Sequence, residues 1–233
     1  MHKKLWIIGL TCLMAVSVMT YITHAEEPIA GPWLWMIVAT DAGVGGQAST
    51  DVDSLDEESK GKVTEEMVAK NGAKEGDEVG DYEWTPGELP ANGDINVCVV
   101  NIKMTKVADF NDVTSYALLI LESSKKQSGV TMGTSSDDSL KVWLNGEEVH
   151  RMAVNRGRGG LPANINGYQD RFEVDLIKGA NLLMVKVSER GGGWGQYVGI
   201  DADVEHHIDF DKFQPVEPAG KLATQWAKIK NAH

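Results

Sequence analysis

Cysteine is scarce in this chain, which limits how the fold can be held together. The 233 residues include two cysteines, Cys12 and Cys98. Cys12 lies within an apolar N-terminal segment with the layout of a signal peptide, so cleavage would leave Cys98 alone. We therefore expect no intrachain disulfide, and about 200 remaining residues can bury a core without one. Cys98 is predicted to be a small core residue rather than a reactive thiol.

Basic residues are also few relative to acidic ones. The chain has 22 lysines and arginines against 34 aspartates and glutamates, which gives a formal net charge of −12. A chain this acidic repels phosphate backbones, so we expect no nucleic-acid partner. The excess of carboxylates favours solubility, and the same groups are suitable ligands for Ca²⁺.

Familiar catalytic motifs are absent from the sequence. It contains no Gly-x-Ser-x-Gly elbow, no His-Glu-x-x-His pair, and no glycine run that opens a helix as a phosphate loop does. His206, His207 and Asp209 have no further Cys or His nearby in the sequence to complete a zinc site. Glu147 and Glu148 would point to opposite faces of a strand, which does not suit a glycosidase acid pair. The sequence therefore predicts a non-catalytic protein.

The N-terminus predicts export. Lys3 and Lys4 precede an apolar run over residues 5–22, and Ala25 offers a small residue at the cleavage position. We expect residues 1–25 to be a signal peptide that is removed, which leaves a secreted, periplasmic or cell-surface protein with no membrane contact. A retained single-span anchor is the alternative.

Residues 26–208 have the patterning of a single β-domain. Aliphatic side chains occupy every second position from residue 140 to residue 144, and Asn145-Gly146 then favours a hairpin turn. A continuously apolar segment at 116–121 predicts a central strand that is covered on both faces. Further strands are expected over residues 32–38, 80–85 (ended by Pro86), 95–104, 172–176, 182–187 and 197–204. Many strands with little helix between them favour a β-sandwich.

Two helices are expected outside these strands. Residues 63–71 form a short helix that Thr64 would cap and Gly72 would end. In the tail, residues 209–233, the side chains of Leu222, Trp226 and Ile229 recur at helical spacing. We expect a short amphipathic helix there, docked on its own domain or on a protein partner.

Several short motifs between residues 136 and 195 carry a resemblance to a known family. The motifs are Ser136-Asp137-Asp138-Ser139, Arg156-Gly157, Gln169-Asp170, Lys178-Gly179-Ala180-Asn181 and Gly192-Gly193-Trp194-Gly195. Together they resemble the galactose-binding-like jelly-roll accessory domain of many exported bacterial proteins, and the paired aspartates resemble the PA14-type sandwich. The resemblance spans residues 31–204. It implies an all-β jelly-roll β-sandwich that is non-catalytic, binds sugars through loops, and holds Ca²⁺ on Asp137 and Asp138.

The residues themselves leave alternatives open. Adjacent carboxylates repel, so either Ca²⁺ lies between Asp137 and Asp138, or one caps backbone N–H groups while the other pairs with Arg156 or Arg158. The two arginines either clamp a ligand or brace an acidic loop. Trp194, surrounded by glycines, either stacks on a sugar ring or folds back as a lid over the sandwich.

The function predicted from the sequence is recognition of a glycan or glycoconjugate, with Ca²⁺ as the only cofactor. The loops around 135–138, 151–170 and 190–196 would form the binding surface. The candidate ligand contacts are Arg156, Arg158, Gln169, Asp170 and Trp194, and the candidate metal ligands are Asp137 and Asp138. The alternative function is a structural or assembly module that binds another protein, with the C-terminal helix as its contact. An enzyme acting on glycosides is a third possibility.

Overall fold

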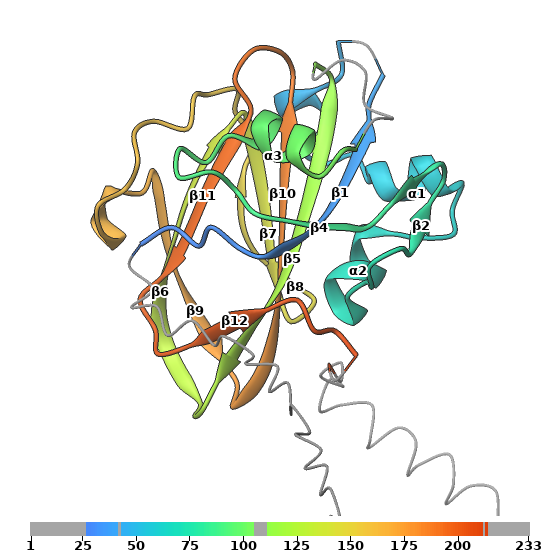
Figure 1. Ribbon diagram of the computed structural model, residues 1–233. Coiled ribbons are helices and arrows are strands. Elements are labelled where there is room, and N and C mark those ends of the chain that lie inside the picture. Colours follow the sequence, from blue (N-terminus) through green and yellow to red (C-terminus); the bar gives the residue numbers. More distant parts are fainter. Residues whose placement is uncertain (1–26, 42, 105–110, 212, 214–233) are drawn as a thin grey trace, which may run out of the picture.

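Two antiparallel β-sheets form most of the structure (Figure 1). The computed structural model describes residues 27–41, 43–104, 111–211 and 213, so the expected signal peptide and the helix expected around Trp226 lie outside it. The larger sheet has the order β4-β1-β5-β10-β7-β8, with β12 also paired to β5, and the smaller sheet has the order β11-β6-β9. The larger sheet contains β1 (Trp33–Ala39), β4 (Thr85–Gly87), β5 (Val113–Ser123), β7 (Ser139–Leu144), β8 (Glu147–Met152), β10 (Gly179–Glu189) and β12 (Glu205–His207). The smaller sheet contains β6 (Gln127–Asp137), β9 (Asp170–Leu176) and β11 (Gly195–Ile200).

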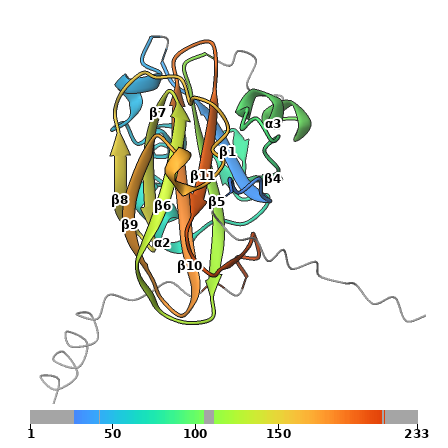
Figure 2. The same ribbon diagram turned by 90° about the vertical axis from the view of Figure 1, so that its left-hand side faces the viewer.

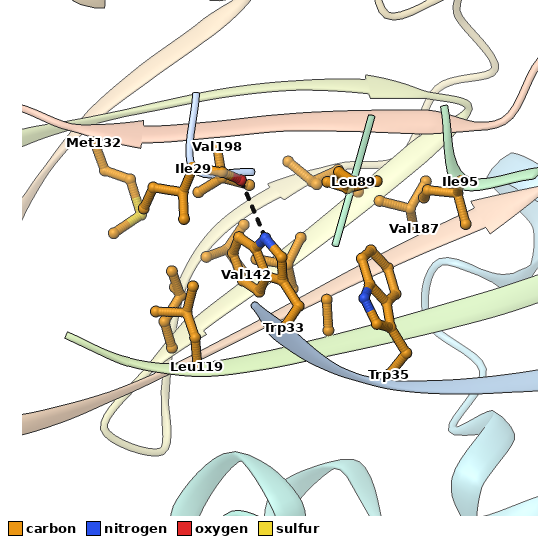
Figure 3. Packing of buried hydrophobic residues seen from close by; sticks show 14 of the residues in the cluster. Ile29, Trp33, Trp35, Leu89, Ile95, Leu119, Met132, Val142, Val187 and Val198 are labelled. Atoms are coloured by element: carbon orange, nitrogen blue, oxygen red, sulfur yellow. Dashed lines mark hydrogen bonds between the residues drawn. The ribbon is translucent and has the colours of Figure 1, made fainter. Parts of the chain in front are cut away.

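The first hydrophobic core fills the space between the two sheets (Figure 3). Trp33 and Trp35 are fully buried in it, with ring centroids 6.4 Å apart. Their indole N–H groups donate to backbone carbonyls, that of Trp33 to Ile29 at 3.1 Å and that of Trp35 to Gly87 at 3.1 Å. Each large ring is therefore buried without leaving its polar atom unpaired.

A second hydrophobic core covers the opposite face of the larger sheet. Side chains of β1, β5 and β10 that point away from the sandwich interior pack there against Leu55, Val68 and Phe210 from the surrounding segments. The central strands are consequently buried on both faces. This explains why β1 and β5 read as continuous apolar runs rather than as alternating ones, as expected for residues 116–121.

Two short helices beside β1 supply part of this cover: α1 (Ser54–Ser59) and α2 (Glu65–Asn71) (Figure 1). The helix expected over residues 63–71 is confirmed with its caps, because the Thr64 side chain accepts from the Met67 N–H at 3.1 Å and the chain leaves the helix at Gly72 with φ 74°. Asp53 ties both helices together. Its carboxylate accepts from the backbone N–H of Asp56 at 2.9 Å and from that of Glu65 at 2.8 Å.

Two strand predictions are wrong. Residues 95–101 form the helix α3 (Ile95–Asn101), which begins where the Asp94 carboxylate accepts from the Asn96 N–H at 2.9 Å. Cys98 is nevertheless fully buried, as expected. The segment expected to be one strand at 80–85 is divided between β3 (Tyr82–Glu83), which pairs with β2 (Glu78–Val79), and β4. Pro86 lies within β4, at the edge of the sheet, where a missing N–H is tolerated.

The hairpin between β7 and β8 is confirmed. Asn145 has φ 53° and Gly146 has φ 85°, the positive values that an Asn-Gly turn adopts. Figure 2 shows β8 and β9 at one side of the sandwich and α3 at the other, beside β4. Within the described part of the chain, no helix is long and apolar enough to cross a membrane.

A buried ion pair lies in the second core. The Lys186 side chain, 1% exposed, donates to Glu65 Oε1 at 2.6 Å and to the carbonyl of Thr50 at 3.2 Å. The Tyr116 hydroxyl donates to the same Glu65 oxygen at 2.8 Å. Burial lowers the pKa of Lys186, and the nearby Glu65 carboxylate opposes that effect. The charge is thus buried together with its partners, so removing one of them leaves the other uncompensated.

We expect Lys186→Met to lower the free energy of unfolding by about 3 kcal/mol, because Glu65 would remain buried without its closest cation. The double variant Lys186→Met/Glu65→Gln should recover part of this loss, as measured by urea unfolding. Lys74→Met is a matched control, since Lys74 forms an exposed ion pair with Asp211 at 2.6 Å and solvent screening should make the effect of its loss much smaller. Equal effects of the two lysine substitutions would contradict this account.

Candidate carboxylate site at one end of the sandwich

Three acidic side chains meet where the two sheets join at one end of the sandwich. Asp137 is the last residue of β6, and Asp138 connects it to β7 through a cis Asp137-Asp138 peptide bond. Ser139 of β7 pairs with Ser188 of β10, which places Glu189, the last residue of β10, beside Asp138. Oxygen atoms of the three carboxylates lie within 4.8 Å of one another.

Burial differs sharply among the three. Asp137 and Asp138 are partly exposed, whereas Glu189 is fully buried. Asp138 Oδ2 accepts from the Arg190 backbone N–H at 3.0 Å. Within the described residues, neither carboxylate oxygen of Glu189 has a hydrogen-bond partner of normal distance and angle. The inner member of the cluster is therefore compensated only weakly, by the backbone N–H of Gly191.

Negative charges within the cluster raise the pKa values of Asp137 and Glu189. Burial, and then the Asp138 charge, raises the pKa of Asp137, with Arg158 partly opposing the change. Burial, followed by the charges of Asp138 and Asp137, raises the pKa of Glu189 to about 8. A cluster with these properties needs either a proton or a cation to relieve the repulsion. Carboxylate oxygens are hard donors of the kind that Ca²⁺ prefers.

The loops around the cluster approach it closely. A side chain at Gly193 would place its Cβ 2.6 Å from Asp137 Oδ2, and one at Gly46 would place its Cβ 3.1 Å from Asp138 Oδ2. Gly46 also lies against Asn155, whose side-chain oxygen accepts from the Gln47 N–H at 2.5 Å. Three separate loops thus close around the carboxylates, and two of them can do so because they carry glycine at the point of contact.

Arg156 braces this region rather than facing a ligand. Its guanidinium forms a two-pronged ion pair with Asp170, with Nη1 donating to Oδ1 at 3.0 Å, and its Nη2 also donates to Ser136 Oγ at 3.0 Å. Ser136 Oγ in turn donates to the Asp138 carbonyl at 2.8 Å. The bracing alternative is therefore the one that these contacts support, although Arg156 pairs with Asp170 and not with Asp137 or Asp138.

The Asp170 carboxylate is held in its charged form. Burial favours its neutral form, but His150 and Arg156 outweigh burial and lower the pKa of Asp170 to about 2. His150 Nε2 lies 3.5 Å from Asp170 Oδ2, and the imidazole stacks on Phe172 with ring centroids 4.4 Å apart. Asp170 and Arg156 therefore form a mutually satisfied pair that links β9 to the end of β6.

Arg158 and Gln169 are the two candidate contacts that remain near the surface. Arg158 Nε donates to the Asn92 carbonyl at 2.8 Å, and its guanidinium lies 5.7 Å from the centre of the Tyr197 ring. Gln169 is exposed, with Oε1 accepting from the Ser136 N–H at 3.2 Å and Nε2 donating to the Gly157 carbonyl at 2.7 Å. Both residues hold loop backbone, and both lie in loops next to the carboxylates.

Trp194 corrects one expectation. Its side chain is fully buried and belongs to the core between the sheets, and its backbone carbonyl accepts from the Ile95 N–H at 2.9 Å. A ring in this position cannot stack on a sugar from solvent. The alternative, in which Trp194 folds back over the sandwich, describes it correctly. The glycines around it let the loop turn the ring inward.

Glu189 is the residue of the cluster that sequence reasoning missed. Its position in the strand is the sequence feature that could have identified it. Val185 and Val187 point into the core between the sheets, and Glu189, two residues further on, points the same way. An acidic residue at an inward position, directly before a glycine-rich loop, could have identified it. The adjacent pair Asp137-Asp138 was conspicuous because the two residues are neighbours in the sequence.

The chain is similar to several solved structures, with low sequence identity and low TM-scores. The PA14 domain of the MpAFP antifreeze protein is 9% identical, with 83% of this chain and 96% of that one covered and a TM-score of 0.43. A PA14 sugar-binding domain from an RTX adhesin is 14% identical, with 76% and 88% covered and a TM-score of 0.32. A GH31 alpha-xylosidase from Xanthomonas citri is 11% identical, with 59% of this chain but only 13% of the enzyme covered and a TM-score of 0.31.

No protein-family model and no curated protein matches the chain. Two of the three structures above are PA14 domains, the class that the sequence resembles. At these identities and TM-scores the likenesses do not indicate what the chain binds.

We expect Asp170→Asn to destabilise the protein in a pH-dependent way. The folded-state pKa of Asp170, about 2, lies below the value near 3.9 of an unfolded aspartate, so its contribution is complete above about pH 5 and is lost as the pH falls through 2. The variant should lose about 2 kcal/mol at pH 7, and the difference from the wild type should narrow as the pH falls below 4, as measured by thermal unfolding. A difference that is constant from pH 7 to pH 3 would show that Asp170 acts by packing alone.

Proposed function

We propose that this chain is an exported, non-catalytic module that binds glycans with the help of a Ca²⁺ held by Asp137 and Asp138. The observation that carries the proposal is the convergence of three carboxylates at one end of the sandwich, none of which forms an ion pair with a lysine or arginine side chain among the described residues. A cation is the simplest partner that satisfies such a cluster.

The donor set suits Ca²⁺ better than a transition metal. The three side chains that converge are carboxylates, and His206 and His207 lie on β12, outside this cluster. Zn²⁺ and its neighbours favour sulfur and imidazole ligands, whereas Ca²⁺ takes six to eight oxygens. Coordination positions that the protein does not fill can accept pairs of sugar hydroxyls, which is the chemistry that a bound Ca²⁺ would supply here.

The surroundings provide further contacts for a glycan. The exposed Gln169 and the partly exposed Arg158 lie in loops that border the aspartates, and their N–H groups can donate to hydroxyl oxygens. Arg156 and Asp170 have a different part in the proposal, because their ion pair fixes the loop through Ser136. Of the five residues expected to touch a ligand, Gln169 and Arg158 are therefore proposed contacts, and Arg156 and Asp170 support the loop. Trp194 lies in the core.

Calcium should raise the melting temperature of the wild-type protein, and Asp138→Asn should abolish most of that increase. The amide keeps the size of the side chain but removes the charge that binds the ion. Asp201→Asn is a matched control, because Asp201 is exposed just after β11 ends, at the opposite end of that strand from Gly195. An equal calcium response in the Asp138 variant and the wild type would contradict a metal site here.

Glycan binding should depend on the ion. On an array of immobilised glycans, we expect binding that EDTA removes, that Ca²⁺ restores, and that Asp138→Asn lacks. Arg158→Gln should weaken the same binding without reducing the calcium-induced shift in melting temperature, because it removes a sugar contact and a positive charge that acts on Asp137, and not a metal ligand. Glycan binding that is unaffected by EDTA would contradict a calcium-assisted mechanism.

A further inference from the structure

We infer that Glu189 is a direct ligand of the proposed ion, the one that binds it from the interior of the protein. This inference rests on the proposed metal site at Asp137 and Asp138. It adds a third carboxylate from a different strand, β10, and so converts a pair of loop residues into a site that includes the sandwich core.

The first argument is the burial of an unpartnered carboxylate. Glu189 is fully buried, and neither of its oxygens has a hydrogen-bond partner of normal distance and angle among the described residues. The backbone N–H of Gly191 offsets the cost of burying its charge only in part. Burying an ionised carboxylate without a partner costs several kcal/mol, so such groups in proteins are paired, protonated or bound to a metal. No ion pair within the described ranges involves Glu189, which leaves the proton and the metal.

The second argument is a contrast within the same strand. Lys186 is also buried on β10, but it points to the other face, where its ammonium group donates hydrogen bonds to Glu65 and to the carbonyls of Thr50 and Val52. The strand therefore carries two buried charged residues, one on each face. The protein supplies three acceptors for Lys186, whereas the side chains that it brings to Glu189 in the cluster are two further carboxylates.

The third argument is the direction from which each carboxylate reaches the cluster. Glu189 is enclosed, while Asp137 and Asp138 are partly exposed. An ion bound by all three carboxylates would be enclosed by protein on the side of Glu189 and open to solvent on the opposite side. That open side is at Asp137 and Asp138, the two partly exposed members, and it is the side from which sugar hydroxyls would approach.

The competing explanation is a proton shared between Glu189 and Asp138. A neutral Glu189 would donate to the Asp138 carboxylate, and the pair would be a structural element with no ion. Glu189→Gln separates the two explanations, because a glutamine amide can donate the same hydrogen bond but has no negative charge to offer a cation. Glu189→Asp adds a second test, since it keeps the charge but withdraws the carboxylate by one methylene group.

The experiment is a calcium titration by calorimetry and by thermal unfolding on four proteins: the wild type, Glu189→Gln, Glu189→Asp and the control Asp201→Asn. We expect both Glu189 variants to bind Ca²⁺ at least about tenfold more weakly than the wild type and to lose most of its calcium-induced stabilisation. The control should behave as the wild type does. Melting temperatures in EDTA verify that the variants fold, and we expect Glu189→Gln to be no less stable than the wild type there, because it removes a buried carboxyl group that repels two others whenever it ionises.

The outcomes are distinguishable. Wild-type calcium affinity in Glu189→Gln would show that the residue serves the shared proton, and wild-type affinity in Glu189→Asp would show that it acts only through its charge. Either result overturns the inference and leaves the aspartate site standing. A wild-type protein with no calcium response overturns the metal site itself, and this inference with it.

Discussion

Burial of the larger sheet on both faces is the constraint on which the rest of the structure depends. The central strands β1, β5 and β10 separate two hydrophobic cores, so nearly every side chain on them is shielded from water. A polar residue on such a strand has to find a partner or bind something. Asn181 illustrates the first outcome, because its amide donates to the Leu121 carbonyl at 3.2 Å and accepts from the Ile177 N–H at 2.9 Å.

The parts of the fold that could be predicted are those with local causes. The caps of α2 at Thr64 and Gly72, and the positive-φ turn at Asn145-Gly146, follow from the residues at those positions. The apolar strands were found because their burial leaves a pattern in the sequence. Which strand lies beside which depends on contacts between distant segments, and neither composition nor period records these.

The strand expected at 95–104 shows where local reasoning failed. A run rich in valine favours a strand, but the Asp94 cap and the packing of Ile95, Cys98 and Val99 into the core make it a helix, with Val97 and Val100 facing outward. Apolar residues at positions 95, 98 and 99 fit a helical period as well as a strand. Tertiary packing selected between the two, and Asp94 was the only local sign.

The candidate site divides in the same way. Asp137 and Asp138 could be predicted because their charges are adjacent along the chain, and Arg156 could be expected to brace a loop. Its partner Asp170 lies 14 residues further on, and Glu189 reaches the site from another strand altogether. The orientation of Trp194 could not be predicted for the opposite reason, because a glycine-rich loop can turn a ring outward or inward. Its packing against the core between the sheets determines which orientation it adopts.

The support around the carboxylates indicates what kind of site this is. Arg156 joins Asp170 of β9 to Ser136 of β6, and Ser136 holds the carbonyl of Asp138, so the Asp137-Asp138 peptide is fixed to the smaller sheet. Glu189 is fixed to the larger sheet through β10. The cluster therefore spans the seam between the sheets, and its geometry is set by the sandwich rather than by the loops. Repulsion among the carboxylates is then opposed by the packing of both sheets, and an ion that binds them would stabilise the sandwich as a whole as well as present a surface for a ligand.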